Sequence, residues 1–493
     1  MTEQKKDDTS GKSKLSLHKR DGKKLIPPLL QIPNLSFTPW VHTRLPEMLW
    51  GALVINSLER DEALKLFRHV GEYASKNKDF SDITLSGIGK YPDQKIKEFI
   101  QHSLSWSKEL KVILRPLLLY KKLPAAHVWK ELLEEPNPKE DWKKVTMAIK
   151  KTYNHQSQEA TDCRWLKIYC MIVSGKMVFS KDTETAAKEI LEYPNYGEMK
   201  KVRPTIRAIE ISLTKNDSDW PKLFWKQNFE STDCVPEEII GKKMKSRQEE
   251  FAKQINDARP TLLEETRKVR NELITHFIES MPNTEIDSKR ETAFGLALYS
   301  TTLFSEIVFY SAASSITGRM ALRALTENYI NFKYLTKKEK EEPKIWEDFH
   351  NYGTGQAKLI YLKLKELAKQ PSCIEMDSID MIANEDRWME FTPINIGHWE
   401  NSDLRKMSEE AGVKEIYDLY YNYTSGFTHG TRAALRESIY QICMNPLHRF
   451  HRIPQFELPL MPNITIDAIT IVNKTLDCLD ETCPKFKTRI KEK

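Results

Sequence analysis

The sequence predicts an all-α protein, and three observations support this fold class. Residues that favour helices, among them Lys, Glu, Leu and Ala, dominate the composition, whereas only 17 of the 493 residues are Gly. Apolar residues recur three and four positions apart in many segments, which is the spacing of one helix face. Alternating runs of β-branched residues, which would indicate strands, are few. The chain is long enough for two or three domains with separate cores.

The N-terminal half is expected to hold a tail and one helical domain. Residues 1–24 should form a disordered basic tail, because eight Lys or Arg face four Asp or Glu without an apolar stretch. Residues 25–215 are predicted to form a multi-helix domain that opens with a proline-rich run of extended or turn structure. Helical patterns follow at residues 60–77, 91–106, 107–122, 124–135, 161–177 and 184–194. The one candidate strand is SDITLSGIG, residues 81–89.

A connecting region and a second domain are predicted for the rest of the chain. Residues 216–284 should comprise a polar linker and a long charged helix, about 241–280, that Pro260 could interrupt. Residues 285–493 are predicted to form a C-terminal helical bundle. Its last helix, residues 464–483, is amphipathic and should dock back onto the others. The remaining helices are expected near residues 291–316, 318–336, 343–369, 402–424 and 429–443.

Composition and motifs exclude several classes of protein. The net charge is +6, from 76 basic and 70 acidic residues, so that only a local basic patch could bind RNA. Seven cysteines are scattered without close CxxC pairs, which predicts free thiols in the cytoplasm, no metal site and no cofactor. No GxGxxG, P-loop or GxSxG motif is present. The basic, aromatic HRFHR segment (448–452), near Cys443, could contact phosphate or a metal, but we favour a solvated loop.

One apolar stretch, residues 293–316, is long enough to cross a bilayer. Glu306 lies near its centre, and Ser and Thr make up much of the remainder. A buried helix of the bundle is therefore the preferred interpretation, and no contact with a membrane is expected. Glu306 would then be a buried polar group of the C-terminal core.

Two segments of the C-terminal half carry polar residues four positions apart, so that each presents a polar stripe on one helix face. Because apolar residues cover much of the remaining surface of both helices, the stripes should be buried and should contact each other. His429 could then act as a general acid or base, or the groups could form a structural network that fixes helix register. The residues are Arg319, Arg323, Glu327 and Asn331 in the first segment and Tyr421, Ser425 and His429 in the second.

A separate motif lies on the long charged helix. Arg270, Asn271 and His276 resemble the Arg-Asn-x4-His pattern of HEPN ribonucleases in residue type and spacing. The resemblance implies RNA cleavage without a metal, in which the histidine transfers protons and the arginine stabilises the charge that develops on the phosphate. In that family two motifs usually meet across a dimer. The alternative is that these residues lie on the solvated face of a charged helix.

The region from about residue 293 to residue 442 resembles an uncharacterised all-helical bacterial family. The resemblance rests on Arg323-x3-Glu327 before a Tyr-Leu pair, and on Tyr421-x3-Ser425-x3-His429. It implies a phage-defence role, so we expect a bacterial defence-type effector, with a HEPN-like ribonuclease in its C-terminal half. The alternative is a non-enzymatic helical scaffold or sensor. RNA, a protein partner of the N-terminal domain, a small ligand and a second copy of the chain are the partners considered.

Overall fold

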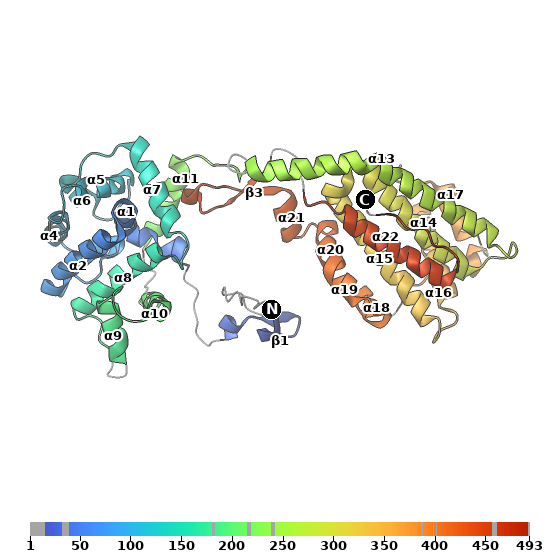
Figure 1. Cartoon of the computed structure of the whole chain (residues 1–493), viewed down its shortest axis with the longest axis horizontal. Coiled ribbons are helices and arrows are strands. Elements are labelled where there is room, and N and C mark those ends of the chain that lie inside the picture. Colours follow the sequence, from blue (N-terminus) through green and yellow to red (C-terminus); the bar gives the residue numbers. More distant parts are fainter. Residues whose placement is uncertain are drawn as a thin grey trace, which may run out of the picture. The chain divides into compact units, whose positions relative to one another are not determined.

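The computed structural model confirms the all-α fold (Figure 1). It describes residues 15–31, 39–179, 183–213, 218–237, 242–385, 388–397, 399–400, 402–455 and 461–491. The chain forms two compact units. The N-terminal unit consists of Met1–Val235 and Cys443–His451, and the C-terminal unit of Pro236–Ile442 and Arg452–Lys493. The division therefore differs from the expected boundaries, because a nine-residue segment near the C-terminus belongs to the first unit.

The described residues of the N-terminal unit form many short helices around one apolar core. In α2 the buried side chains of Phe67, Val70 and Ala74 recur at helical spacing and face α8. Of the disordered tail expected over residues 1–24, residues 1–14 lie outside the described residues, and a small hairpin of β1 (Lys19–Asp21) and β2 (Lys24–Ile26) begins within the remainder. The helices are α1 (Leu49–Ser57), α2 (Arg60–Lys76), α3 (Leu85–Ile88), α4 (Asp93–Leu104), α5 (Leu110–Leu114), α6 (Ala126–Leu132), α7 (Pro138–Thr152), α8 (Gln158–Val173), α9 (Glu184–Leu191), α10 (Met199–Ser212) and α11 (Trp220–Ser231).

Two further expectations for this unit were wrong. The candidate strand 81–89 contains helix α3, which begins after Thr84, whose hydroxyl accepts a hydrogen bond from the Gly87 N–H at 3.0 Å. The expected linker after residue 215 contains α11, whose Trp220 and Phe224 are buried in the core. The buried face of α11 consists of aromatic side chains four residues apart. Because polar residues lie between them, the sequence pattern of this helix was interpreted as a linker.

A cluster of charged side chains is buried in the N-terminal unit. Glu210 of α10 forms ion pairs with Arg44, with Arg164 Nε at 3.5 Å and with Lys167 Nζ at 3.5 Å. Arg164 also lies over the ring of Trp40. Burial lowers the pKa of Arg164 to about 10, although the charge of Glu210 opposes that shift. Glu210 therefore balances several cations in a region of low dielectric.

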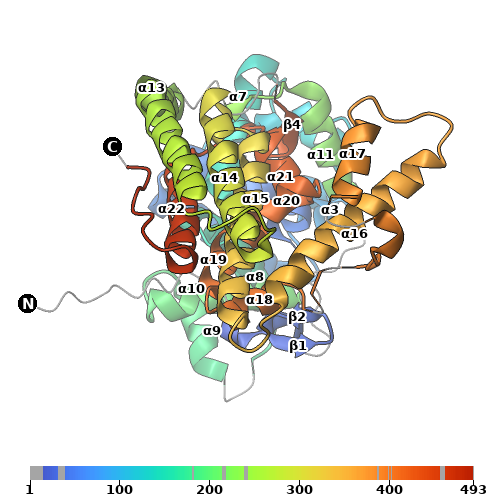
Figure 2. The same cartoon turned by 90° about the vertical axis from the view of Figure 1, so that its right-hand side faces the viewer.

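The C-terminal unit packs long helices side by side (Figure 2). Helix α13 runs without interruption through Pro260, and α22 packs against α14 and α15. Gly412, in the left-handed conformation with φ of 76°, ends α18, so the helix expected over 402–424 is broken into shorter pieces. The helices are α13 (Lys242–Glu279), α14 (Ser288–Phe309), α15 (Ile316–Lys338), α16 (Ile345–Lys365), α17 (Met376–Ala383), α18 (Leu404–Ala411), α19 (Lys414–Ile416), α20 (Asn422–Thr428), α21 (Arg432–Ser438) and α22 (Thr465–Thr482), and the strands are β3 (Tyr440–Ile442) and β4 (Arg452–Pro454).

Helix α14 is the one helix in the described chain that is long and apolar enough to cross a membrane. It packs against α13, α15, α16 and α22 within the C-terminal unit, as expected of a bundle helix. The prediction that Glu306 is buried is wrong, because its side chain is exposed. The next two residues, Ile307 and Val308, are buried, so the face of α14 that packs in the bundle excludes Glu306, which lies on the outer face.

Candidate functional site

Helix α15 begins in a tightly packed turn that positions the first residue of its polar stripe. The Ser315 hydroxyl accepts a hydrogen bond from the Gly318 N–H at 3.2 Å and so caps the helix. A side chain at Gly318 would lie 2.2 Å from the Ala312 carbonyl oxygen, so only glycine fits there. Arg319 is buried and donates hydrogen bonds to the carbonyls of Ala313, at 3.0 Å, and Pro462. Arg319 therefore fastens the helix start to the segment before α22.

The two polar stripes meet at Tyr421, as their spacing predicts. Arg323 Nη2 donates a hydrogen bond to the Tyr421 hydroxyl at 2.8 Å, and its guanidinium lies 4.9 Å from the centre of the Tyr421 ring. Glu327 Oε1 lies 3.7 Å from Arg323 Nη2 and 3.5 Å from the Tyr421 hydroxyl. Burial alone would lower the pKa of Arg323, but Tyr421 and Glu327 reverse that effect and raise it. Arg323 is thus a permanent cation within this network.

The remaining residues of the stripes do not join that network. His429 is exposed just after α20 ends, and Ser425 is half-buried, with its carbonyl accepting the His429 N–H at 3.2 Å. The helix ends here because Gly430 is left-handed, with φ of 58°, and the stripe stops with it. The expectation that His429 is buried beside Arg323 and Glu327 is wrong.

The HEPN-like motif lies on α13 with its residues on different faces. Arg270 and Asn271 are exposed, whereas His276 is half-buried, with Nε2 3.4 Å from the Cys483 carbonyl. The His276 ring also packs near Phe294, at 5.6 Å between ring centres. Six residues along a helix correspond to a rotation that leaves Arg270 and His276 about 120° apart. Within one chain, the structure does not bring the arginine to the histidine.

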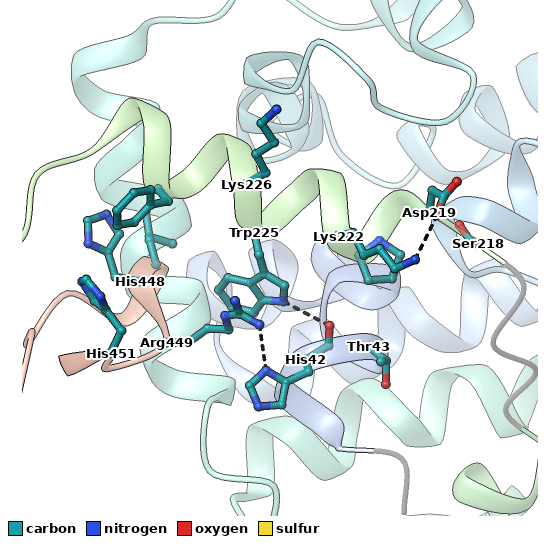
Figure 3. A pocket seen from close by; sticks show the side chains of 13 residues that line it. His42, Thr43, Ser218, Asp219, Lys222, Trp225, Lys226, His448, Arg449 and His451 are labelled. Atoms are coloured by element: carbon teal, nitrogen blue, oxygen red, sulfur yellow. Dashed lines mark hydrogen bonds and ion pairs between the residues drawn. The ribbon is translucent and has the colours of Figure 1, made fainter. Parts of the chain in front are cut away.

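A cavity in the N-terminal unit was not anticipated as a site from the sequence. Its volume is about 920 Å³, and side chains from three separated segments line it (Figure 3). Both lysines in its lining lie one turn apart on α11, and an arginine and two histidines of the HRFHR segment also line it. The lining residues are His42, Thr43, Ser218, Asp219, Pro221, Lys222, Trp225, Lys226, Phe229, Leu447, His448, Arg449 and His451.

Contacts between distant segments hold Arg449 in place at this cavity. The Trp225 indole N–H donates to the His42 carbonyl at 3.1 Å, and the Arg449 guanidinium lies 5.3 Å from the centre of the Trp225 ring (Figure 3). Arg449 Nη1 donates to His42 Nδ1 at 3.0 Å. Burial, followed by the charge of Arg449, lowers the pKa of His42, which leaves this imidazole neutral at neutral pH. Arg449 therefore supplies a positioned charge, and His42 accepts its hydrogen bond.

The sequence held one signal for this cavity, the basic and aromatic HRFHR segment. The interpretation of that segment as a solvated loop holds for Arg449 and Arg452, which are exposed, but not for His448, which is only 5% exposed. Its partners on α11 could not be identified, since the polar stretch around residues 216–240 was interpreted as a linker.

Comparisons with known proteins support the resemblance of the C-terminal half to an uncharacterised family. Residues 292–441 match DUF5677, described as a family of unknown function. No curated protein and no solved structure matches the chain significantly. The match covers α15, which carries Arg323 and Glu327, and the π-helical turn Tyr417–Tyr421 that leads into α20. The cavity of the N-terminal unit lies outside it.

Proposed function

We propose that the protein is a sensor whose N-terminal unit binds a phosphate-bearing nucleoside, either as a free nucleotide or within single-stranded RNA. The observation that carries this proposal is the cavity of about 920 Å³, whose wall combines basic and aromatic side chains. This volume falls within the range of small-ligand sites in proteins.

The charges of the cavity suit an anion. Lys222, Lys226 and Arg449 are cations at neutral pH, whereas Asp219 is the one acidic residue among the lining side chains. Asp219 Oδ1 lies 3.4 Å from Lys222 Nζ and offsets part of that charge. Arg449 is braced between His42 and Trp225, so little conformational entropy would be lost when it binds a phosphate.

An aromatic surface is available next to these cations. Phe229 lines the cavity and is 55% exposed, so that its ring is accessible to a ligand. Stacking of a nucleobase on an aromatic ring contributes about 1–3 kcal/mol per base and does not depend on which base it is. A ring beside phosphate-binding cations is the arrangement that a nucleotide requires.

Binding to the full-length protein tests this proposal. A fluorescent single-stranded RNA, a duplex RNA and ATP are titrated in separate experiments, and the first or the third should bind. The double variant Lys222→Ala/Lys226→Ala should lose at least about tenfold in affinity and show a weaker salt dependence. Both side chains are largely exposed, so the fold should be retained. Lys130→Ala, on the exposed surface of α6, is the matched control.

A HEPN-like ribonuclease in the C-terminal unit is the second candidate function. It is supported by the exposure of Arg270 and Asn271 on α13, which leaves them accessible to a second copy of the chain. A dimer could supply the arginine that His276 lacks within its own chain. The proposed role as a bacterial defence effector depends on this activity and on the resemblance of the C-terminal region.

Cleavage of RNA by the purified protein tests the ribonuclease. Activity should persist without added metal and disappear in Arg270→Ala and His276→Ala, whereas Arg267→Ala, exposed one turn earlier on α13, should remain active. Growth arrest on overexpression, relieved by His276→Ala, would support the defence role. Binding of RNA without cleavage in any sample would leave the sensor as the function.

A further inference from the structure

Four side chains that commonly bind metals converge in the N-terminal unit, outside the region that matches DUF5677. Cys234 follows α11, and the other three belong to the segment between β3 and β4. One potential ligand atom from each side chain lies within 4.8 Å of all the others. The four residues are Cys234, Cys443, His448 and His451.

The distances between these atoms match the edges of a tetrahedral zinc site. Cys234 Sγ lies 3.4 Å from His448 Nδ1 and 3.2 Å from His451 Nε2. Cys443 Sγ lies 3.5 Å from His448 Nδ1. Zn–S bonds of about 2.3 Å and Zn–N bonds of about 2.0–2.1 Å, at tetrahedral angles, place sulfur and nitrogen about 3.6 Å apart. The ligand atoms therefore already surround a space of the size that Zn²⁺ requires.

The second nitrogen of His448 is held by the protein. His448 Nε2 lies 3.1 Å from the Thr232 carbonyl and 3.0 Å from the Thr232 hydroxyl. A proton on Nε2 that is donated to the carbonyl leaves the lone pair of Nδ1 directed at the two sulfurs. A histidine that binds a metal through one nitrogen and a carbonyl through the other is the usual arrangement at zinc sites.

Backbone hydrogen bonds fix the two ligand-bearing segments against each other. The Met444 N–H donates to the Val235 carbonyl at 2.7 Å, next to both cysteines, and the Cys443 N–H donates to the His451 carbonyl at 2.9 Å. The side chain of Asn445 bridges to the Asp233 carbonyl at 2.9 Å. The ligands are therefore held by local structure, as in a site formed in advance of metal binding.

We propose that Cys234, Cys443, His448 and His451 bind one Zn²⁺ as a structural site. Binding displaces the two thiol protons, so two thiolates and two neutral imidazoles cancel the charge of the ion. Two sulfurs and two nitrogens in a tetrahedral arrangement favour zinc over the harder divalent cations. Because protein atoms fill all four positions, the site is structural and leaves no position for a substrate.

The zinc site would fasten residues 443–451 to the end of α11. His448 and His451 also line the cavity, and Arg449 lies between them, so the ion would fix the wall from which this arginine projects. The zinc proposal rests on the geometry of the four ligands alone and does not require that the cavity binds a nucleotide.

Metal analysis of the full-length protein tests the proposal. The protein is purified without chelators or metal-affinity resin, under reducing conditions, and its zinc content is measured by mass spectrometry. About one zinc ion per chain is expected in the wild type and in Cys373→Ser, which alters an exposed cysteine elsewhere. Cys234→Ser should lose most of the zinc, and its exposed position should allow the variant to fold.

Replacement of zinc by Co²⁺ provides a second test that does not depend on any variant. The wild-type protein should develop the strong visible bands of tetrahedral Co²⁺ and the charge-transfer absorption of cobalt–thiolate bonds. A wild type that contains no zinc and binds neither ion would overturn the proposal. So would full zinc content in Cys234→Ser, or a Cys234–Cys443 disulfide in the protein as isolated from cells.

Discussion

The two units bring polar side chains together in different ways. In the C-terminal unit, Arg323 and Glu327 lie on successive turns of one helix, and Tyr421 of the second patterned segment completes their network. In the N-terminal unit, Arg44 pairs with Glu210, and Cys234 meets residues more than two hundred positions later. Helical periodicity reveals a stripe on one helix, but it carries no information about which distant loop will face it.

The units also differ in how deeply these groups are buried. The side chains of Arg323 and Glu327 are 19% and 36% exposed, whereas those of Arg164 and Glu210 are 1% and 2% exposed. An ion pair in contact with water contributes little to stability, whereas removal of one partner of a buried pair leaves a charge in a low dielectric. Equivalent substitutions should therefore have larger effects in the N-terminal unit.

Glu210→Ala should produce the largest effect, because it leaves Arg44, Arg164 and Lys167 without their shared counter-charge. A loss of about 3–5 kcal/mol in the free energy of unfolding is expected. Urea denaturation followed by tryptophan emission measures it, since most of the 11 tryptophans lie in the N-terminal unit. They are Trp40, Trp50, Trp106, Trp129, Trp142, Trp165, Trp220 and Trp225.

The matched control for Glu210→Ala is Glu198→Ala, which alters an exposed carboxylate that pairs with Lys201 at 2.9 Å. It should change stability by less than about 0.5 kcal/mol. If Glu210→Ala unfolded with the same free energy as the control, the buried cluster would not contribute to the stability of the protein.

Removal of the metal should have the next largest effect. A chelator should destabilise the N-terminal unit by about 3 kcal/mol, the linkage expected for a ligand present at some hundred times its dissociation constant. The transition seen by tryptophan emission should move to lower urea. Cys234→Ser should already show this lower stability and respond no further to the chelator, and an equal response in that variant would contradict a zinc site.

Tyr421→Phe tests the network of the C-terminal unit. It removes the hydroxyl that accepts from Arg323 but keeps the ring beneath the guanidinium, so a loss of about 1 kcal/mol is expected. Urea denaturation followed by far-ultraviolet circular dichroism measures it. Tyr299→Phe, at an exposed position of α14, and His429→Ala should both change stability by less than about 0.5 kcal/mol.

Glu47→Gln should show the smallest effect, visible as a pH dependence. Burial raises the pKa of Glu47, although hydrogen bonds from the Ser86 N–H at 2.9 Å and the Ser86 hydroxyl at 2.7 Å oppose the shift. The pKa of Glu47 is higher in the folded state than in the unfolded state, so the protonated side chain stabilises the fold at acidic pH. This stabilisation is lost as the pH rises through the raised pKa of the folded state. The stability of Glu47→Gln relative to wild type should therefore be higher at about pH 7 than at about pH 4.

Thermal unfolding of wild type and Glu47→Gln at both pH values provides the measurement for this prediction. Glu72→Gln, on the exposed face of α2, serves as the control and should follow the wild type at both. A relative stability of Glu47→Gln that does not change with pH would contradict the raised pKa.

The sequence predicted those features that depend on local periodicity. The all-α class, the long helix α13 and the docked helix α22 follow from apolar residues at helical spacing. The contact of Arg323 with Tyr421 was expected because two polar stripes in one helical bundle need partners. The boundaries were less accurate where Gly412 and Gly430 end helices through left-handed conformations. A glycine that ends a helix and a glycine that admits a ligand are identical in a sequence.

The cavity and the cysteine–histidine cluster depend on tertiary contacts that leave no local pattern. His448 and His451 were noted, but Cys234 lies 209 residues before Cys443, so no motif with short ligand spacing was present. The helix α11 was hidden because polar residues separate its buried aromatic side chains. The functional proposals for Arg270, Asn271 and His276 stay predictions, since they depend on a second copy of the chain or on an RNA substrate.

The discontinuity of the N-terminal unit has a consequence for its synthesis on the ribosome. Residues 443–451 belong to this unit, so its last segment begins 208 residues after Val235 and is complete 216 residues after it. At about 5–20 residues per second, this interval lasts about 10–40 s. An N-terminal domain usually folds as soon as it emerges, but here Cys234 is translated 209 residues before Cys443, the first of the three residues proposed to bind zinc with it. A ribosome that stops before codon 443 releases a chain in which neither the cavity nor the cluster can be completed.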